Sequence, residues 1–253
     1  MLADKIVLVT GAASGIGAAV SARLAAAGAR VYRADLATLE SASSLGAGAP
    51  GRGLVLDIRD EVAWSVAIET VLDADKRLDA LVNCVGVAAG SPLPDTTLAE
   101  WQRVIGINLD GAFLATKYGI RAMRATGGAI VHVGSASGIR PAPGAAAYST
   151  SKAALRMLVQ TAAKECRQAG WAIRINAVSP AGVKTPMWRT MPFFQDLVRQ
   201  HGSEDAAFAA MTQAGGGTFI EPDAIARVVA FLLSDDAQHI TGVELPVDDG
   251  YVL

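Results

Sequence analysis

The stretch Thr10-Gly11-Ala12-Ala13-Ser14-Gly15-Ile16-Gly17 joins a short apolar run to an alanine-rich segment with the composition of a helix. Glycines at such a turn let the backbone bend tightly and approach a pyrophosphate, which lies among the free N–H groups of the helix N-terminus. A glycine trio alone is a weak signal, because many strand-to-helix turns contain glycine. Here a second predicted strand leads to Asp35, eighteen residues after Gly17, and the combination predicts a dinucleotide-binding turn.

The alternation of short apolar runs and longer helical patterns continues along almost the whole chain. Parallel strands joined by right-handed helical crossovers produce this rhythm. We therefore expect an α/β fold, a doubly wound sheet of seven parallel strands (a Rossmann fold) with helices on both faces. The expected strands are Ile6–Val9, Ala29–Tyr32, Leu54–Leu56, Ala80–Val82, Ile130–Val133, Ile173–Val178 and Val243–Val247, and helices should begin near Gly15, Leu36, Asp60, Thr97, Ala146 and Glu221.

The chain shows no tandem repeat, low-complexity tract or linker, so residues 1–253 should form a single domain. The longest departure from the alternation is an insertion at residues 185–218, which we expect to be irregular. It is rich in aromatic and methionine side chains such as Met187, Trp188 and Phe208, and this composition argues against disorder. Two interpretations stay open: a lid over a site, or a small satellite core beneath a surface loop.

Composition excludes several classes of protein. Of the 253 residues, 51% are apolar and 18% are charged, as in globular proteins, and the net charge of −2 gives no reason to expect nucleic acid or an anionic membrane as partner. No apolar run approaches the roughly 20 residues of a membrane span, and Met1 to Lys5 does not open a signal peptide. The two cysteines, Cys84 and Cys166, form no disulfide framework, and zinc-ligand spacings are absent, so we expect a cytoplasmic protein without a bound metal.

Tyr148 and Lys152 lie four positions apart in Tyr148-Ser149-Thr150-Ser151-Lys152, and on a helix they share one face. An unperturbed tyrosine has a pKa of about 10, too high for ready proton exchange at neutral pH, and an adjacent ammonium favours the phenolate and lowers that pKa. Ser135, thirteen residues upstream at the end of an apolar run, could hold a carbonyl oxygen beside the phenol. By itself such a pair is usually ordinary helix surface, so its weight depends on the rest of the chain.

Asp35 bears on which dinucleotide binds. At the end of the second strand its carboxylate can accept hydrogen bonds from both ribose hydroxyls of an adenosine and would repel a 2′-phosphate, which favours NAD over NADP. Arg33 shares that strand face, and a guanidinium near the ribose could bind the phosphate. Arg33 could equally pair with Asp35 or lie in solvent.

Together these residues resemble the short-chain dehydrogenase/reductase family in its single-domain form, from Lys5 to the C-terminus. The turn has that family's G-x-x-x-G-x-G spacing, Asn83-Cys84-Val85-Gly86 is similar to its Asn-Asn-Ala-Gly segment, and Ala181 stands where glycine is common. The resemblance implies a catalytic tetrad and a set of cofactor contacts. The tetrad would be Asn108, Ser135, Tyr148 and Lys152, and the cofactor contacts would be Gly11, Ser14, Gly15, Ile16, Gly17, Asp35, Asp57, Ile58, Asn83, Gly86, Tyr148, Lys152, Pro180, Val183 and Thr185.

The family pattern also implies a role for each catalytic residue. Tyr148 would give or take the proton on the substrate oxygen, Lys152 would lower the pKa of Tyr148 and bind the nicotinamide ribose, and Ser135 would hold the substrate oxygen. Asn108 would anchor a water that relays protons towards Lys152. Asp57, at the end of the third strand, would contact the adenine.

Three segments are candidates for a substrate pocket: residues 87–93, 137–145 and 187–211. They are mostly apolar and carry few charges that could bind a phosphate or coenzyme A, which suggests an apolar secondary alcohol or ketone as substrate. The candidate substrate contacts are Ser137, Met187 and Trp188.

Two framework stretches, Gly127 to Ile130 and Trp171 to Asn176, are similar to bacterial 3β/17β-hydroxysteroid dehydrogenases, which favours a cyclic, aryl or steroid-like alcohol. An NADPH-dependent 3-oxoacyl-carrier-protein reductase on the same fold stays open as an alternative, as does a non-catalytic dinucleotide-binding protein. Asp35 and the net charge count against the first, and the complete tetrad counts against the second. The resemblance further implies a homotetramer in which the helices of Leu98 to Met123 and Ala146 to Ala169 pair between subunits.

Overall fold

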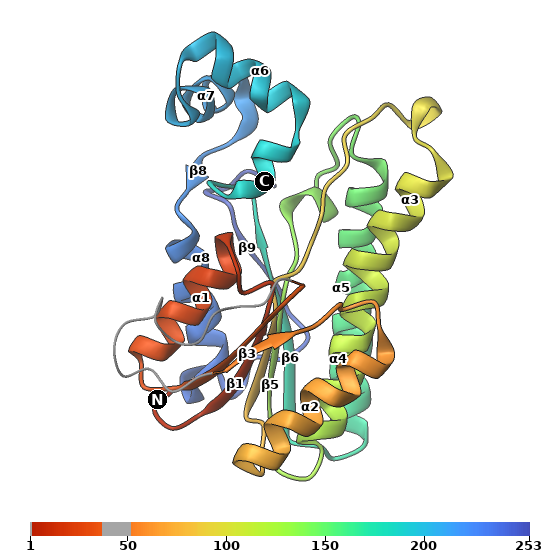
Figure 1. Ribbon diagram of the computed structural model, residues 1–253, viewed down its shortest axis with the longest axis vertical. Coiled ribbons are helices and arrows are strands. Elements are labelled where there is room, and N and C mark those ends of the chain that lie inside the picture. The colour runs from red at the N-terminus through yellow and green to blue at the C-terminus, as the bar shows by residue number, and fades with distance from the viewer. Residues whose placement is uncertain (1, 37–51) are drawn as a thin grey trace.

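The computed structural model describes residues 2–36 and 52–253. Within these residues, seven parallel strands form one sheet in the order β3-β2-β1-β4-β5-β6-β9, as the sequence predicts (Figure 1). The strand order reverses between β1 and β4, and such a switch point opens a crevice at the carboxyl ends of the strands. The strands are β1 (Ile6–Thr10), β2 (Arg30–Asp35), β3 (Gly53–Val55), β4 (Ala80–Asn83), β5 (Gly128–Val133), β6 (Ile173–Pro180) and β9 (Glu244–Val247).

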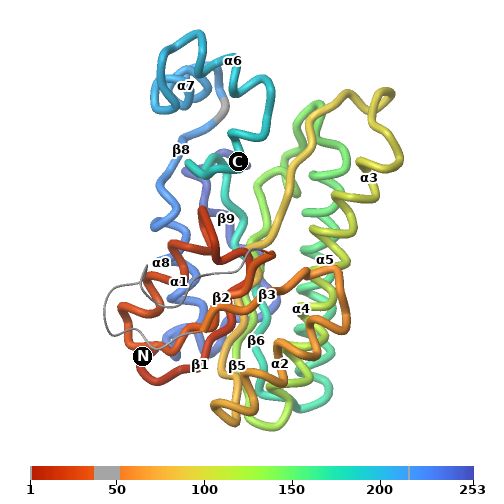
Figure 2. The backbone as a smooth tube through the Cα atoms, viewed as in Figure 1, coloured from red at the N-terminus to blue at the C-terminus, as the bar shows by residue number. Residues whose placement is uncertain are grey.

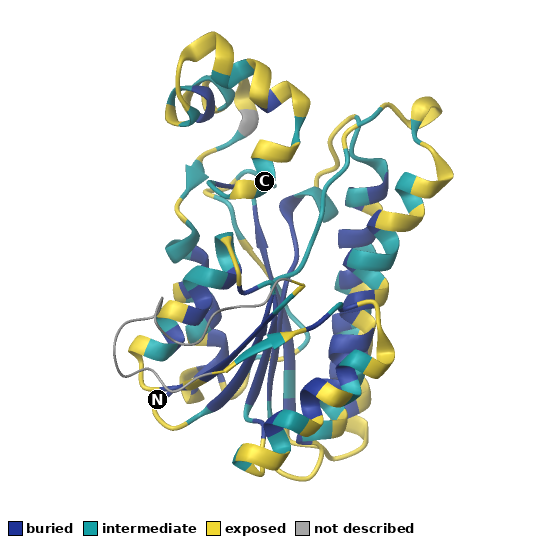
Figure 3. Ribbon diagram, viewed as in Figure 1, coloured by how far each residue is buried: buried dark blue, intermediate teal, exposed yellow. Residues whose placement is uncertain are grey.

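Helices cover both faces of this sheet, because successive strand residues point to opposite faces and both sets are apolar. Val7 and Val9 of β1 pack with α1 and α8 in one core, whereas Ile6 and Leu8 pack with α2, α4 and α5 in the other. Figure 3 shows the buried strands between these two layers. The helices are α1 (Gly15–Ala26), α2 (Glu61–Asp75), α3 (Leu98–Ile105), α4 (Gly111–Met123), α5 (Ala146–Gln168), α6 (Pro192–His201), α7 (Glu204–Met211) and α8 (Pro222–Leu233).

The starts of the crossover helices follow local capping chemistry. Asp60 accepts hydrogen bonds from the N–H groups of Val62 and Ala63 at the start of α2, and Thr97 accepts from Glu100 at the start of α3. These helices begin within one residue of their predicted starts. The helix expected to begin near Leu36 cannot be compared, because residues 37–51 lie outside the described part of the chain.

The insertion at residues 185–218 is more regular than expected. A 3₁₀ turn (Pro186–Thr190), α6 and α7 form a unit, here called the cap (residues 186–211), that stands beyond the end of the sheet (Figure 2). Gly202 ends α6 with a φ of +83°, and Ser203 caps α7 by accepting from the Ala206 N–H at 3.2 Å. The expectation of an irregular segment is therefore wrong, because Pro192, Gly202 and Ser203 are ordinary helix boundary residues.

The cap carries its own small core, as one of the two interpretations predicts. Phe194, Ala207 and Phe208 are buried in it, and Trp188 packs against them. Two short parallel strands connect the cap to the rest of the chain, β7 (Gly182–Val183) and β8 (Phe219–Ile220).

Candidate active site

The glycine-rich turn between β1 and α1 packs as tightly as its spacing predicts. Gly11 and Gly15 have φ values of +68° and +53°, which glycine adopts without strain. A Cβ on Gly17 would overlap the Gly11 carbonyl oxygen, and one on Gly11 would lie 3.1 Å from the main chain of Cys84. Ser14 is the N-cap of α1, and within the described helix its side chain makes no capping hydrogen bond. The turn and the unpaired amides of the first helical turn therefore fit a pyrophosphate.

Asp35 ends β2 beside this turn. Its Oδ2 accepts a hydrogen bond from the Ala13 N–H at 3.0 Å, and its Oδ1 accepts from the Leu36 N–H at 2.8 Å. Each carboxylate oxygen keeps a further lone pair for a ribose hydroxyl. Arg33 is only 5% exposed, so the suggestion that it lies in solvent is wrong.

Asp57 and Ile58 follow β3, but their side chains are engaged within the protein. The Arg59 guanidinium bonds the Asp57 carboxylate, with Nη2 2.6 Å from Oδ2, and this hydrogen-bonded pair lowers the pKa of Asp57. Asp57 lies two residues beyond the strand end at Val55, not at the end itself. The Ile58 side chain packs so closely against Gly111 that a Cβ on Gly111 would overlap it. Only the main chain of Ile58 is therefore free to contact a cofactor.

Asn83 and Gly86 occupy the turn that follows β4. Asn83 Oδ1 accepts from Thr10 Oγ1 at 2.7 Å, and its Nδ2 lies 3.4 Å from His132 Nδ1. The Asn83 side chain therefore joins β1, β4 and β5. A Cβ on Gly86 would lie 3.3 Å from Lys152 Nζ, so the absence of a side chain there leaves room for the ammonium.

Asn108 lies in a π-helical turn (Gly106–Asp110) between α3 and α4 and is 1% exposed. Its Oδ1 accepts from the Val87 N–H at 2.8 Å, and its Nδ2 donates to the Val87 carbonyl at 2.9 Å and to Ser151 Oγ at 3.0 Å. The Asn108 amide thus fixes the loop after β4, and only a second lone pair of Oδ1 is left for the expected water. The sequence did not indicate Ser151 and Val87 as hydrogen-bond partners of Asn108, although Ser151 lies inside the Tyr148-to-Lys152 stretch.

Ser135, Tyr148 and Lys152 come together where β5 ends and α5 begins. Ser135 lies close enough to the Tyr148 phenol to influence its pKa, and Ser135 Oγ accepts from the Ser137 N–H at 3.1 Å. Lys152 Nζ donates to the Val133 carbonyl at 2.8 Å and lies 5.8 Å from the centroid of the Tyr148 ring. Lys152 is 3% exposed, so its charge is held in a buried position.

Burial governs the proton affinities of this group. Desolvation raises the pKa of Tyr148, and the hydrogen bond with Ser135 offsets part of that rise. Desolvation also lowers the pKa of Lys152 to about 8. The structure therefore does not show the expected lowering of the Tyr148 pKa, because the ammonium is itself desolvated and bonded to a main-chain carbonyl. Burial raises the pKa of the neighbouring Cys84 thiol to about 12, which makes it a poor nucleophile.

Three further expected cofactor residues lie on the chain after β6. Pro180 ends β6 and is buried, and Val183 is 5% exposed in the core shared by α1 and α8. Thr185 lies against the turn, since a Cβ on Gly15 would be 3.2 Å from Thr185 Cγ2. Thr185 therefore meets the N-terminus of α1, whereas Val183 accepts from Trp188 Nε1 at 2.8 Å and anchors the cap.

The three candidate substrate contacts have different surroundings. Ser137 and Met187 are half-buried, on the segment after β5 and on the cap. Trp188 packs instead against Phe194 and Phe208, with ring centroids 5.9 and 6.3 Å away. Trp188 is half-buried and packs against the core of the cap, and its role as a substrate contact stays a prediction.

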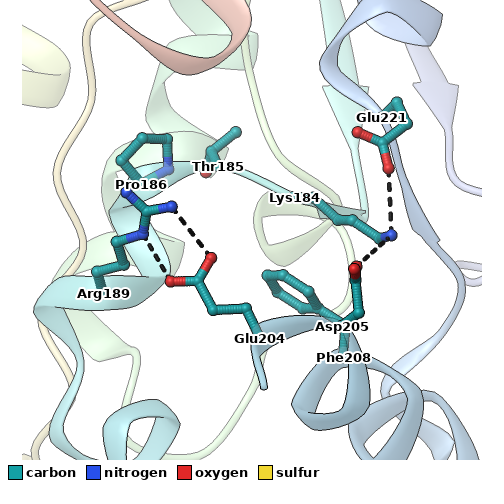
Figure 4. A pocket seen from close by; sticks show the side chains of 8 residues that line it. All are labelled: Lys184, Thr185, Pro186, Arg189, Glu204, Asp205, Phe208 and Glu221. Carbon is teal, nitrogen blue, oxygen red and sulfur yellow. Dashed lines mark hydrogen bonds and ion pairs between the residues drawn. The ribbon is translucent and has the colours of Figure 1, made fainter. Parts of the chain in front are cut away.

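A pocket of about 310 Å³ lies between the stem of the cap, α7 and the start of α8 (Figure 4). Lys184 Nζ lies 2.9 Å from an Asp205 oxygen and 3.1 Å from a Glu221 oxygen, and Arg189 Nε lies 2.7 Å from Glu204. None of the tetrad residues lines this pocket. Its ion pairs hold α7 to the stem, and it is separate from the site around Tyr148.

The fold and the site define a class of protein: a dinucleotide-dependent oxidoreductase with a serine, a tyrosine and a lysine at the carboxyl end of a Rossmann sheet. A family model described as enoyl-(acyl carrier protein) reductase matches residues 11–252. The chain belongs to the short-chain dehydrogenase/reductase family, whose members bind NAD(P) and act on CH–OH groups. Among the described residues, no helix has the length and apolar character needed to span a membrane.

Individual relatives are similar over nearly their whole length. Cyclopentanol dehydrogenase of Comamonas sp. (strain NCIMB 9872) is 38% identical, with 98% of this chain and 97% of that protein covered. The 3-beta-hydroxysteroid dehydrogenase of Comamonas testosteroni is 33% identical, with 98% and 96% covered. The crystal structure of 3-ketoacyl-(acyl-carrier-protein) reductase from Brucella melitensis complexed with NADH superposes with a TM-score of 0.84 at 28% identity, and both chains are covered completely.

Proposed function

We propose that this protein interconverts an apolar secondary alcohol, cyclic, aryl or steroid-like, and its ketone, with NAD as the hydride acceptor or donor. The convergence of Ser135, Tyr148 and Lys152 beside the glycine-rich turn carries this proposal. NAD supplies the hydride chemistry when bound, and the protein supplies position and control of protonation. The relatives named for cyclopentanol and for a hydroxysteroid support the substrate class.

Tyr148 acts as general acid in ketone reduction and as general base in alcohol oxidation. The Ser135 hydroxyl lies beside the phenol, so it can hold a substrate oxygen there. Because desolvation raises the pKa of Tyr148, the neutral phenol is the resting form and is ready to donate a proton in reduction. In oxidation the phenol must first lose its proton, and Ser135 is the neighbour that lowers the Tyr148 pKa against the effect of burial.

Asn108 is a positioning residue in this scheme. Its amide holds Val87 on the loop after β4 and Ser151 on α5, one residue before Lys152. It therefore fixes the two segments that flank the ammonium. Lys152 is directed by the Val133 carbonyl to the side of Gly86, where it would meet the nicotinamide ribose.

The cofactor contacts proposed from the family pattern have compatible positions. The turn residues and Thr185 surround the N-terminus of α1, where a pyrophosphate is favoured. Asp57 and the main chain of Ile58 would contact the adenine. The proposed contacts are Gly11, Ser14, Gly15, Ile16, Gly17, Asp35, Asp57, Ile58, Asn83, Gly86, Tyr148, Lys152, Pro180, Val183 and Thr185.

Asp35 supports NAD over NADP. The amides of Ala13 and Leu36 hold its carboxylate at the end of β2, and a fixed negative charge there repels a 2′-phosphate. In the variant Asp35→Ser, we expect the ratio of kcat/KM for NAD to that for NADP to fall by about tenfold or more. A wild-type preference for NADP would contradict the assignment and make Arg33 the determinant.

The first experiment is a panel of cyclic, aryl and steroidal secondary alcohols, assayed for NADH formation by the wild-type enzyme and Tyr148→Phe. We expect the variant to lose about 10²–10⁴-fold in kcat while its affinity for NADH stays within about twofold. Tyr118→Phe, on α4, is the matched control and should stay active. Turnover by Tyr148→Phe would refute the acid–base role. No wild-type turnover despite NADH binding would refute the substrate class, and turnover of a 3-oxoacyl thioester would then favour the reductase alternative.

We also propose a homotetramer assembled through α4 and α5. Phe113 on α4 and Met157 on α5 are large apolar side chains with 49% and 52% of their surface exposed. Large apolar side chains exposed on these two helices are candidates for contact with another subunit. Light scattering should give four chains for the wild type and fewer for Phe113→Glu with Met157→Glu. A monomeric wild type would contradict this assembly.

A further inference from the structure

The C-terminal turn (residues 248–253) is a built structure at the end of β9. Asp248 Oδ1 accepts from the Gly250 N–H at 3.1 Å, its Oδ2 accepts from the Val252 N–H at 3.0 Å, and the Tyr251 N–H donates to the Asp248 carbonyl at 3.0 Å. These bonds hold the main chain of the turn around Tyr251. Figure 1 shows the C-terminus between the cap and the end of the sheet.

Arg140 binds this turn in two ways. Its Nη1 donates to the Tyr251 carbonyl at 2.7 Å, and its guanidinium carbon lies 4.7 Å from the centroid of the Tyr251 ring. Arg140 belongs to the segment that leaves Ser135, and its N–H donates to the Ala136 carbonyl at 2.8 Å. The C-terminal turn is thus attached to the segment that carries the catalytic serine.

The Tyr251 ring also meets the return from the cap. Gly217 has a φ of +78°, and a Cβ on it would lie only 2.8 Å from Tyr251 Cδ2. Two residues later, Phe219 enters the aromatic core of the cap, 5.3 Å from Trp188 between ring centroids. Tyr251 therefore contacts both the Ser135 segment, through Arg140, and the chain that returns from the cap.

Among the described residues, no hydrogen bond or ion pair joins the cap directly to the Ser135 segment. Lys184, next to β7, bonds Asp205 of α7, and Arg189 bonds Glu204 of α7 within the cap itself. The segment of residues 137–145 bonds the loop after β4 through the Gly144 carbonyl and the Ser91 N–H at 3.0 Å. The segment of residues 137–145 and the loop after β4 are two walls of the proposed substrate pocket, and they are thus joined directly. The third wall, the cap, is joined to them through Tyr251.

We propose that Tyr251 and Arg140 are positioning residues that set the separation between the Ser135 segment and the cap, and thereby the size of the alcohol accepted beside Tyr148. This inference rests on the proposed function. Both Arg140 contacts use the aromatic ring or the main-chain carbonyl of Tyr251, so Tyr251→Phe preserves them. Tyr251→Ala removes the ring, and Arg140→Gln removes the guanidinium.

The test compares kcat/KM for cyclopentanol and for a steroid alcohol in the wild type and the three variants. For Tyr251→Ala and Arg140→Gln we expect the ratio of the two values to change by about fivefold or more, while Tyr251→Phe stays within about twofold. Phe231→Ala on α8 is a remote aromatic control and should also keep the wild-type ratio. An equal change for both alcohols would mean a general structural role and would overturn the proposal.

Hydrogen exchange gives a second readout that needs no turnover. In Tyr251→Ala, amides of residues 217–220 and of α7 should exchange several-fold faster, while the first turn of α5 is unchanged. Unchanged exchange at residues 217–220 would refute the connection between Tyr251 and the cap, even if the ratio of the kcat/KM values for the two alcohols had changed. If the wild type oxidises no alcohol, the proposed function fails, and the exchange result still decides whether Tyr251 positions the cap.

Discussion

His132 should make this protein lose stability in mild acid. It lies on β5 with no exposed surface, between Asn83 and Thr116. Thr116 Oγ1 already donates to the Ala112 carbonyl at 2.8 Å, so it must accept from His132 Nε2, 3.0 Å away. His132 Nδ1 then accepts from the Asn83 amide. The hydrogen-bond network therefore assigns a neutral imidazole with its proton on Nε2 and leaves no acceptor for a second proton.

The size of the effect follows from linkage. Burial, with a smaller contribution from the charge of Lys152, lowers the pKa of His132 from 6.5 to about 3. Above pH 6.5 neither the folded nor the unfolded chain protonates this group, so it contributes no pH dependence. Below pH 6.5 only the unfolded chain binds the proton, and the free energy of unfolding falls by about 1.4 kcal/mol per pH unit. The loss reaches about 5 kcal/mol near pH 3, where the folded chain is protonated too.

The assay is urea denaturation at fixed protein concentration between pH 7.5 and 4.5, on the wild type and His132→Gln. A glutamine amide can accept from Asn83 and donate to Thr116 but does not titrate. We expect the variant to be less stable at pH 7.5 and to lose stability less steeply below pH 6.5, by about 1.4 kcal/mol per pH unit. His201→Gln, on the exposed surface of α6, should keep the wild-type slope. Equal slopes for the wild type and His132→Gln would refute the reasoning.

Three further predictions concern the turn, the lysine and the cap. Gly17→Ala places a methyl against the Gly11 carbonyl oxygen and should weaken NADH binding about tenfold or more in a fluorescence titration, whereas Gly90→Ala, in open space, should not. Lys152 should titrate near pH 8 in NMR of labelled lysine, because burial lowers its pKa to about 8, and a midpoint near 10.5 would contradict this. Trp188→Ala empties the core of the cap and should cost about 3 kcal/mol of its local stability, measured by hydrogen exchange of α6 and α7; unchanged exchange would show that the cap does not depend on that core.

The sheet and the glycine-rich turn could be predicted because local signals and global fold agree there. Apolar residues of β1 fill both cores, so the strand reads as a continuous apolar run, and Gly17 must be glycine for α1 to begin where it does. Tyr148 and Lys152 could be paired because helical spacing alone places them on one face. In each case residues that act together are close in the sequence.

The missed features depend on contacts between distant segments. Sequence spacing does not reveal that Trp188 packs against Phe208 and Phe219, which lie 20 and 31 residues further along the chain. The pKa of Tyr148 depends on how deeply the fold buries it, which residue spacing does not express. His132 and Asn83 are 49 residues apart, and they meet because β4 and β5 are neighbours in the sheet.

The difference between the features that the sequence predicts and those that it does not has a structural cause. Beneath the site, Thr10, Asn83, His132 and Thr116 form one hydrogen-bonded chain across β1, β4, β5 and α4, so the strand ends that carry the reacting groups are rigidly joined. Above the site, the walls are the cap and the loops, connected to those strand ends by short stems and by Tyr251. The reaction depends on the rigid part, whose residues have fixed spacing along the strands and α5. The choice of alcohol depends on the upper part, whose geometry is set by contacts among segments far apart in the chain, and this is why the chemistry could be predicted from sequence more closely than the substrate.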